Sequence, residues 1–490
     1  MYCILVIDVG TSSSRGILYN KKGTALFTKQ LPYTPIYSTD KKAEISPAIF
    51  TSALISLVTA CHTYAAAHSI MICGISITCQ RSSLIPVDHY GRPLHNVILW
   101  QDQRSLEICE ELSSEAERIY EKTGLILSHI PFAPKITWYQ RHYPENDHKV
   151  HKYLTIVDYL IHIMTGRYVT DYTYGSRTLL MDLRTCQWND SLLDLFHIKK
   201  EKLCSLIPQG TIVGNTTSQF NSLVGFSSSI PVITAGGDQQ CSTLGAGCIE
   251  HGHTLITTGT DTYVTTTSDS IHIDPSSKII CGISAVCGKY HLESSILAGS
   301  TTFNWFLRTF YPDETSYERI NYDIFLTKPG SNQILAFPHL LGKASPSWNP
   351  YATGVFYGVH PVCTRGDFGR SILEGIAYEI KDNLKLLPSL ADPSTSLRIA
   401  GGLTNNTTFN QIQADIYGRV TLLKNAETTA LGACINGWIA IGMYKDYKEA
   451  SEAIGSSYPS VTYKPDLLLQ PLYCNLYEKR TCLYDKLFQK

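Results

Sequence analysis

The sequence predicts an α/β protein with two domains of similar topology, and three observations lead to this prediction. The chain has 490 residues, more than one hydrophobic core usually supports. Runs rich in β-branched residues alternate with segments of helical periodicity, as in layered α/β folds. Two similar glycine-threonine turns, "DVGTSSSR" at residues 8–15 and "TTGTDTYV" at residues 257–264, each stand between two strand-like runs.

The N-terminal half begins with the first of these hairpins, at residues 3–30, where two extended runs flank a small polar turn. Apolar residues at helical spacing predict a helix over residues 45–68, and "IMICGISIT" predicts a strand over residues 70–78. "NVILW" predicts a short strand after it. Residues 105–124 predict one further helix that ends at Gly124, a typical C-cap.

The second hairpin lies at residues 253–273, and two glycine turns at other places in the chain lead from a strand into a helix. The first of these turns, in "VITAGGDQQCSTLGAG" at residues 232–247, places Asp238 where the helix begins; the other lies in "RIAGGLTNN". Because the two hairpins resemble each other, we expect an internal duplication. It predicts an N-terminal domain at residues 1–248 and a C-terminal domain at residues 249–490.

Composition narrows the class of protein. A formal net charge of -1 gives no electrostatic reason to expect nucleic acid or an acidic membrane as a partner. We find no apolar run that approaches a membrane span and no signal peptide at the N-terminus. The 15 cysteines include no CxxC pair, so neither a zinc site nor a disulfide framework is expected, and a reducing cytoplasm is favoured.

The polar turns suggest phosphate chemistry. A glycine-threonine turn offers free backbone N–H groups and hydroxyls to phosphate oxygens. Asp8, beside the first turn, could hold magnesium through water, or could simply bond its own backbone. Asp238 has two interpretations as well: a helix N-cap, or a base that takes the proton from an attacking hydroxyl.

Seven motifs together resemble the FGGY carbohydrate kinases over residues 3–450. In order they are "DVGTSSSR", "LWQDQR", "AGGDQQCSTLGAG", "TTGTDTY", "SILEGIAYEI", "AGGLTNN" and "AETTALGA". The resemblance implies two actin-like (ribonuclease H-like) ATPase domains around a central cleft. It also implies phosphorylation of a sugar or polyol hydroxyl, with ATP as donor and Mg2+ as the metal.

The same resemblance implies roles for individual residues. Asp238 matches the family's catalytic base, and Asp8 matches its magnesium-associated acid. Residues that would bind the nucleotide are Thr11, Ser12 and Arg15 at the first turn, Gly259 and Thr260 at the second, and Gly401, Gly402 and Asn406 beside adenosine. Residues that would line the sugar pocket are Arg81, Trp100, Asp238, Gln239 and Tyr263.

The substrate is less constrained. "TCQRSSLIPVD" and "NVILWQDQR" resemble the glycerol kinase branch, but Ser82 stands where that branch carries Glu, and Ile130 where it carries Tyr. "PFAPKITW" and "YVTDYTYGSRTLLMDL" resemble the xylulokinase branch, which usually has Met-His in place of Arg81-Ser82. Loss of two hydrogen-bonding groups should disfavour glycerol, so we expect a pentulose-like ketose; a polyol kinase of glycerol-kinase type is the alternative.

Two other classes of protein stay open at this point. An actin-like ATPase would hydrolyse ATP without a sugar, and a kinase-derived sugar sensor would bind a sugar without turnover. Asp8 and Asp238 are both present, which favours the enzyme over the sensor. A homodimer is compatible with the sequence.

Overall fold

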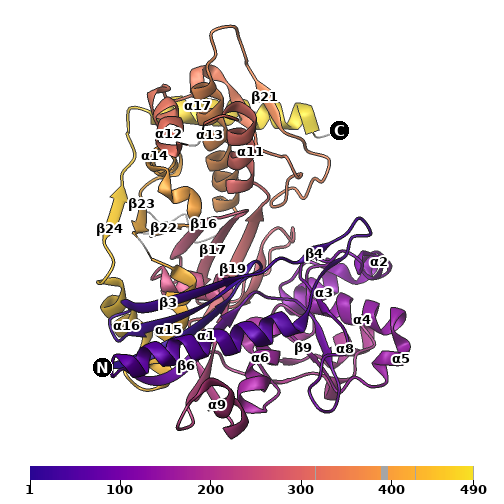
Figure 1. Cartoon of the computed structure of the whole chain (residues 1–490). Coiled ribbons are helices and arrows are strands. Elements are labelled where there is room, and N and C mark those ends of the chain that lie inside the picture. Colours follow the sequence, from indigo (N-terminus) through magenta and orange to yellow (C-terminus); the bar gives the residue numbers. More distant parts are fainter. Residues whose placement is uncertain (315, 388–395, 425, 489–490) are drawn as a thin grey trace. The chain divides into compact units, whose positions relative to one another are not determined.

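The computed structural model describes residues 1–314, 316–387, 396–424 and 426–488, which form two compact units (Figure 1). The first unit comprises Met1–Ile249, Thr267–His291 and Ala426–Tyr458. The second comprises Glu250–Thr266, Leu292–Asn425 and Pro459–Lys490. The leading segment thus ends beside the expected boundary at residue 248, while two later segments return to the first unit. The domain limits of the sequence analysis stay a prediction.

The first unit is built on a six-stranded sheet with the order β14-β15-β6-β1-β2-β3. Along the chain these strands are β1 Tyr2–Val9, β2 Ser13–Asn20, β3 Ala25–Pro32, β6 Met71–Cys79, β14 Thr211–Asn215 and β15 Pro231–Gly237. β1 and β2 form the expected antiparallel hairpin, with Asp8 opposite Arg15. β6 runs parallel to β1, and β15 parallel to β6. The carboxyl ends of three neighbouring strands therefore meet at one edge, where ligands of open α/β sheets usually bind.

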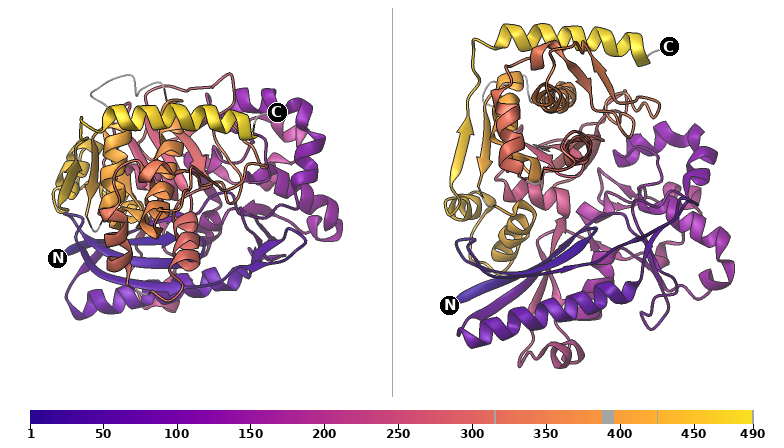
Figure 2. Two further views of the ribbon diagram at one scale, coloured as in Figure 1. Left: turned by 90° about the horizontal axis from the view of Figure 1, so that it is seen from above. Right: turned by 45° about the horizontal axis from the view of Figure 1, so that its top comes forward.

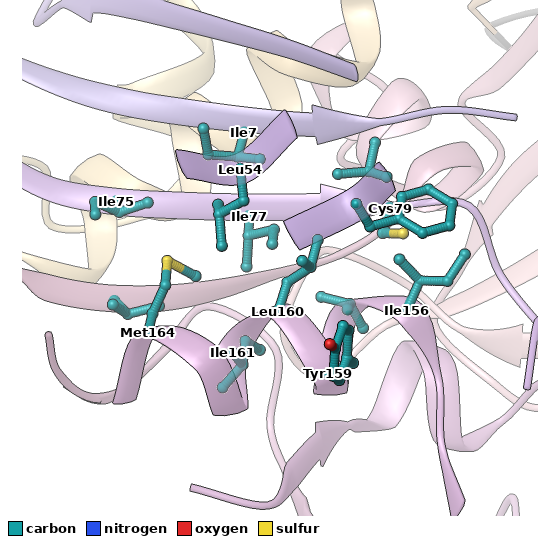
Figure 3. Packing of buried hydrophobic residues seen from close by; sticks show 14 of the residues in the cluster. Ile7, Leu54, Ile75, Ile77, Cys79, Ile156, Tyr159, Leu160, Ile161 and Met164 are labelled. Carbon is teal, nitrogen blue, oxygen red and sulfur yellow. The ribbon is translucent and has the colours of Figure 1, made fainter. Parts of the chain in front are cut away.

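Both faces of this sheet are covered, which explains why β1 reads as an unbroken apolar run. Cys3, Leu5 and Ile7 face a core that includes residues of α1 Pro47–Ala67 and α6 Ile156–Thr165. Ile4 and Val6 face the opposite core, with residues of α10 Asp238–Gly245 and α15 Thr428–Ala440. In Figure 3, Leu54 of α1 and Leu160 of α6 lie beside Ile7 and Ile77 of the sheet.

The remaining elements of the first unit surround this sheet. The short strands are β4 Ile36–Tyr37, β5 Ala43–Ile45, β7 Ile85–Val87, β8 Val97–Ile98, β9 Lys152–Leu154, β10 Val169–Asp171, β11 Met181–Asp182, β12 Gln187–Trp188, β13 Ser205–Ile207 and β18 Ile280–Ile283. The helices not yet named are α2 Leu106–Glu111, α3 Ala116–Thr123, α4 Phe132–His142, α5 Pro144–Asp147, α7 Tyr172–Gly175, α8 Asp190–Leu195, α9 Ser218–Val224 and α16 Tyr447–Gly455, with 3₁₀ turns η1 Ser113–Glu115 and η2 Lys200–Lys202.

Two expectations were wrong in part. The helix over residues 105–124 is interrupted: α2 is followed by η1 and then by α3, although Gly124 is the expected left-handed C-cap, with φ 69°. We expected no apolar run long enough to span a membrane, yet α1, with 21 residues, is long and apolar enough by composition. Its residues Phe50, Leu54 and Leu57 are buried in the core. The helix runs along the sheet of the first unit (Figure 1). This is the packing of a core helix.

The second unit repeats the topology of the first sheet. Six neighbouring strands of its seven-stranded sheet are, in spatial order, β19 Tyr290–Ile296, β17 Thr262–Ser268, β16 Thr254–Thr258, β22 Leu397–Ala400, β23 Val420–Leu423 and β24 Ser460–Tyr463. β16 and β17 form the second expected antiparallel hairpin. β22 and β23 continue in parallel from β16, and β24 closes the edge antiparallel, as β6, β15 and β14 do in the first unit. The like topology of the two domains, expected from the two hairpins, is seen in the two sheets, while the internal duplication stays a prediction.

Helices of the second unit pack around this sheet and on one another (Figure 2). They are α11 Ser300–Phe310, α12 Tyr317–Leu326, α13 Arg365–Leu384, α14 Thr407–Tyr417 and α17 Gln470–Phe488, with 3₁₀ turns η3 Ser331–Gln333 and η5 Gly402–Asn405 and a small hairpin of β20 Leu335–Phe337 and β21 Val355–Tyr357. α17, yellow in Figure 2, is tied to α13 by Arg480, which bonds the buried Glu379.

A buried carboxyl in α6 leads to a prediction about stability. Asp158 forms a capping box with Thr155, and its own pKa is raised to about 7, chiefly by burial. Because the folded pKa lies above the unfolded one, stability is full at low pH and is lost as pH rises towards and through 7. We expect Asp158→Asn, which keeps an acceptor for the Thr155 N–H, to be more stable than the parent at pH 8, by about 1–4 kcal/mol.

The measurement is urea unfolding of parent and variant at pH 5 and pH 8. The advantage of Asp158→Asn should shrink at pH 5, where the parent carboxyl is mostly protonated. Asp190→Asn is the matched control, because the Asp190 side chain is exposed. Equal destabilisation of the Asp158 variant at both pH values would contradict the argument.

Candidate active site

Three strand ends place the candidate site in the first unit. β1 ends just after Asp8, β6 is followed by Gln80 and Arg81, and β15 leads into Asp238. Because these strands are parallel neighbours, their carboxyl ends bring residues far apart in sequence to one edge of the sheet.

Asp238 is the first residue of α10, and its carboxylate contacts a guanidinium and a backbone amide. Arg81 Nε lies 3.2 Å from Asp238 Oδ1. The backbone N–H of Gln239 donates to the same oxygen at 2.8 Å. The N-cap position belongs to Gly237, one residue before the expected one, although the Asp238 carboxylate does take up a backbone N–H of the helix start as expected. A cationic donor and a helix N-terminus both favour the ionised carboxylate, the form that a proton acceptor needs.

The double glycine before Asp238 has a steric reason. A Cβ atom on Gly237 would lie 2.8 Å from Arg81 Cδ and 2.7 Å from Gln240 Oε1. Gly236 has φ 115°, a value that side chains rarely adopt. Arg81 can therefore lie directly over this backbone, where its Nη1 also donates to Gln240 Oε1 at 3.3 Å. The sequence "GGDQQ" thus provides both the space that the Arg81 side chain occupies and the acid that Arg81 contacts.

The first glycine-threonine turn is connected to the candidate sugar side by hydrogen bonds. Trp100 Nε1 donates to Thr11 Oγ1 at 3.2 Å, and Thr11 Oγ1 donates to Gln80 Oε1 at 3.4 Å. Gln80 Nε2 in turn donates to the carbonyl of Gly10 at 3.2 Å. Ser12 is exposed at the tip of the turn. Sequence reasoning missed Gln80, although its place directly after β6 and before Arg81 was a usable signal.

A second missed residue is Glu427, which precedes α15. Arg15 Nη1 lies 2.8 Å from Glu427 Oε2 and 4.0 Å from Asp8 Oδ2. Burial raises the pKa of Asp8 to about 7; Arg15 lowers it, and the carboxylates of Asp238 and Glu427 raise it further. The signal was the motif "AETTALGA", whose acid stands at a helix start.

The residues present fit a magnesium ion of the kind that phosphoryl transfer uses. Among the residues that the structure describes, no group of three or more His, Cys, Asp or Glu could hold a metal. Magnesium typically binds one or two carboxylates and completes its shell with water and substrate phosphates. Asp8, a buried acid near two other acids, carries negative charge that such a cation would offset.

In the second unit, the glycine-threonine turn is fixed to α11 through its carbonyls. Ser300 N–H donates to the Gly259 carbonyl at 2.7 Å, and Thr301 Oγ1 donates to the Thr260 carbonyl at 2.9 Å. The Thr260 side chain is exposed. On the strand before the turn, the hydroxyl of Thr258 is buried without a hydrogen-bond partner. The turn therefore keeps the Gly259 and Thr260 carbonyls occupied and leaves the Thr260 side chain exposed.

The third glycine turn lies beside this hairpin. Gly401 has φ 94°, and a Cβ there would lie 2.5 Å from the Thr258 carbonyl oxygen, so only glycine fits. Gly402 opens η5 with free space around it. Asn406 is the N-cap of α14: its Oδ1 accepts from Phe409 N–H at 3.0 Å, and its Nδ2 donates to Asn321 Oδ1 at 2.9 Å.

The structure thus groups the candidate residues by unit. Arg81, Trp100, Asp238 and Gln239 lie in the first unit with the first turn, and Tyr263 lies on β17, opposite Thr257, with the second turn. Two sheets of one topology, each with a glycine-threonine turn, and a carboxylate at the strand ends are the features that the sequence analysis expects of a phosphotransferase with an alcohol group as acceptor.

Family models agree with this class. The N-terminal domain of the FGGY family of carbohydrate kinases matches residues 3–245, and its C-terminal domain matches residues 255–441. The chain belongs to this family. The two-domain, actin-like fold expected from the sequence is confirmed, and so is the activity of a carbohydrate kinase. The family uses ATP as its phosphate donor.

Individual relatives agree on the reaction and differ in the acceptor. The chain is 30% identical over 479 residues to glycerol kinase 1 of Clostridium tetani, covering 95% of this chain and 94% of the relative. It superimposes on xylulose kinase from Lactobacillus acidophilus with a TM-score of 0.90 at 25% identity, covering 100% and 99% of the two chains. Gluconate kinase from Lactobacillus acidophilus superimposes with a TM-score of 0.91 at 25% identity, with the same coverage of the two chains. The substrate of this chain is therefore a sugar or polyol.

Proposed function

We propose that this kinase phosphorylates a pentulose-like ketose, with Asp238 as the catalytic base and Asp8 as the acid that associates with magnesium. Asp238 would accept the proton of the attacking hydroxyl while Arg81 holds its carboxylate in place. Thr11, Ser12 and Arg15 would contact the phosphates from the first turn, and Gly259 and Thr260 from the second. Magnesium, when bound, would neutralise charge on the transferred group. Gly401, Gly402 and Asn406 would border adenosine.

The observation that carries the choice of acceptor is the environment of Ser82. The glycerol kinase branch, by resemblance, has a glutamate at this position. Ser82 is 4% exposed, has φ 66°, and directs its hydroxyl to the Arg177 carbonyl at 3.4 Å. A short side chain bonded to the backbone supplies no carboxylate for a small triol. Ile130, at the position of the branch's tyrosine, offers no side-chain hydrogen bond either.

Glycerol is the second candidate, and a specific observation favours it. The curated relatives that share 28–30% identity over at least 90% of this chain are named glycerol kinases. The fold does not separate the candidates, because xylulose and gluconate kinases at 25% identity and a glycerol kinase from Plasmodium falciparum at 24% all share it. The hydrogen bonds lost at Ser82 and Ile130 support the proposal of a larger acceptor, because a site that recognises hydroxyls discriminates through them.

The test is ADP release by the purified protein with ATP, magnesium and one acceptor at a time: ketopentoses, aldoses, alditols, sugar acids and glycerol. We expect a ketopentose to give the highest kcat/KM. Glycerol as the best acceptor would overturn the proposed substrate. ADP release that no acceptor increases would indicate an actin-like ATPase, and acceptor binding without release a sensor.

A single substitution tests the role of Ser82. We expect Ser82→Glu to raise kcat/KM for glycerol about tenfold and to lower it for the best ketose, because a hydrogen bond to a charged group is worth about 1.5–3 kcal/mol. The two acceptors serve as controls for each other, since a folding defect would lower both values. A variant that loses equally on both acceptors would show that position 82 does not select the substrate.

The cysteines support a reducing compartment. All 15 are unpaired, and those at the candidate site, such as Cys79 and Cys241, are fully buried. We infer a cytoplasmic enzyme on this basis.

A further inference from the structure

The proposed function assigns no role to the ion pair between Arg15 and Glu427. Arg15 is on β2, directly opposite Asp8, where it would meet a phosphate at the first turn. Its Nη1 atom is nevertheless closer to Glu427, at 2.8 Å, than to Asp8, at 4.0 Å. The side chains are 31% and 61% exposed respectively, so an incoming ligand can reach both.

Glu427 is aimed at Arg15 by the helix that it precedes. It is the N-cap residue of α15, yet its side chain makes no capping hydrogen bond. α15 is fixed against α10 by close contact: a Cβ on Gly432 would lie 1.9 Å from the Cys241 carbonyl oxygen, and one on Gly245 1.9 Å from the Thr428 carbonyl oxygen. The backbone at Glu427 thus has a set position relative to Asp238, which begins α10, and the Glu427 carboxylate reaches Arg15 from there.

The charges around this pair explain what a phosphate would change. Asp8, Asp238 and Glu427 are three acids, and Arg81 is engaged with Asp238. Arg15 is therefore the cation that Glu427 and an incoming phosphate would share. An exposed ion pair contributes only about 0–1 kcal/mol, so a multiply charged phosphate can displace the carboxylate.

We propose that Glu427 is a positioning residue that holds Arg15 at the first turn in the nucleotide-free enzyme and yields it to the nucleotide phosphates. This inference rests on the proposed role of Arg15 in phosphate binding. Its consequence has a definite sign: Glu427 competes with the nucleotide, so removing its charge makes nucleotide binding tighter. A purely structural role for Glu427 would instead make binding weaker.

The experiment is calorimetric titration of the full-length enzyme with ADP in the absence of sugar. We expect Glu427→Gln to bind ADP about two- to fivefold more tightly than the parent, with unchanged thermal unfolding. Glu452→Gln, an exposed acid of α16 in the same segment, is the matched control and should bind like the parent.

A double-variant cycle shows whether the effect runs through Arg15. In an Arg15→Gln background, the further change Glu427→Gln should tighten ADP binding by less than it does in the parent. Equal tightening in both backgrounds would mean direct repulsion of the phosphates and would overturn the proposal, as would unchanged or weaker binding by the single variant. A parent that does not bind ADP at all would overturn the proposed function itself, a distinguishable result.

Discussion

Asp238→Asn should lower turnover with the best acceptor by about 10²- to 10⁴-fold while the protein stays folded and binds ADP. Asparagine has the size of aspartate, and its Oδ1 can still accept from Arg81 Nε and the Gln239 N–H, which now bond Asp238. It cannot take the proton from the attacking hydroxyl. The loss should therefore appear in kcat, since the groups proposed to bind the nucleotide are untouched.

The measurement is steady-state kinetics at saturating ATP and acceptor, together with ADP titration and thermal unfolding. A variant that is unfolded or does not bind ADP would say nothing about the chemical step. Thermal unfolding and ADP titration are therefore the controls for the loss of turnover. Turnover within about threefold of the parent would exclude Asp238 as the base, because a positioned base contributes far more than that.

The parts of the site that could be predicted from the sequence are those set by local pattern. β1, its turn and β2 follow from an apolar run, a glycine-threonine pair and a second run, and the structure pairs Asp8 with Arg15 accordingly. The strand-to-helix turn at Asp238 could also be predicted locally, because the two glycines Gly236 and Gly237 follow an apolar run and indicate a turn. Given parallel strands, the meeting of Asp8, Arg81 and Asp238 at one edge follows as well.

What could not be predicted depends on packing over long sequence distances. Glu427 pairs with Arg15 only because the segment Ala426–Tyr458 returns to the first unit and α15 packs on α10. The break between α2 and α3 falls at the 3₁₀ turn η1, which begins with Ser113 and Ser114, although helical periodicity continues through it. Gln80, by contrast, could have been predicted as a site residue, because it is a polar residue directly after the buried strand β6, as Arg81 nearly is.

Gly432→Ala should lower the free energy of unfolding by about 3 kcal/mol or more, an effect at the high end for a single substitution. A Cβ at this position would lie 1.9 Å from the Cys241 carbonyl oxygen, far inside van der Waals contact. The neighbouring atom is backbone, so relief requires α15 and α10 to move apart. Since Asp238 begins α10 and Glu427 precedes α15, the same movement should displace site residues.

Urea unfolding measures the loss of stability, and ADP release with the best acceptor measures the displacement of the site. Gly455→Ala is the matched control: it lies at the end of α16 in the same segment, nothing lies within 4 Å of the added Cβ, and its stability should stay within about 0.5 kcal/mol of the parent. If Gly432→Ala unfolds at the urea concentration of the parent, α10 and α15 are not in the close contact described. If it is destabilised but keeps full turnover, the helix pair holds the fold together without setting the position of Asp238.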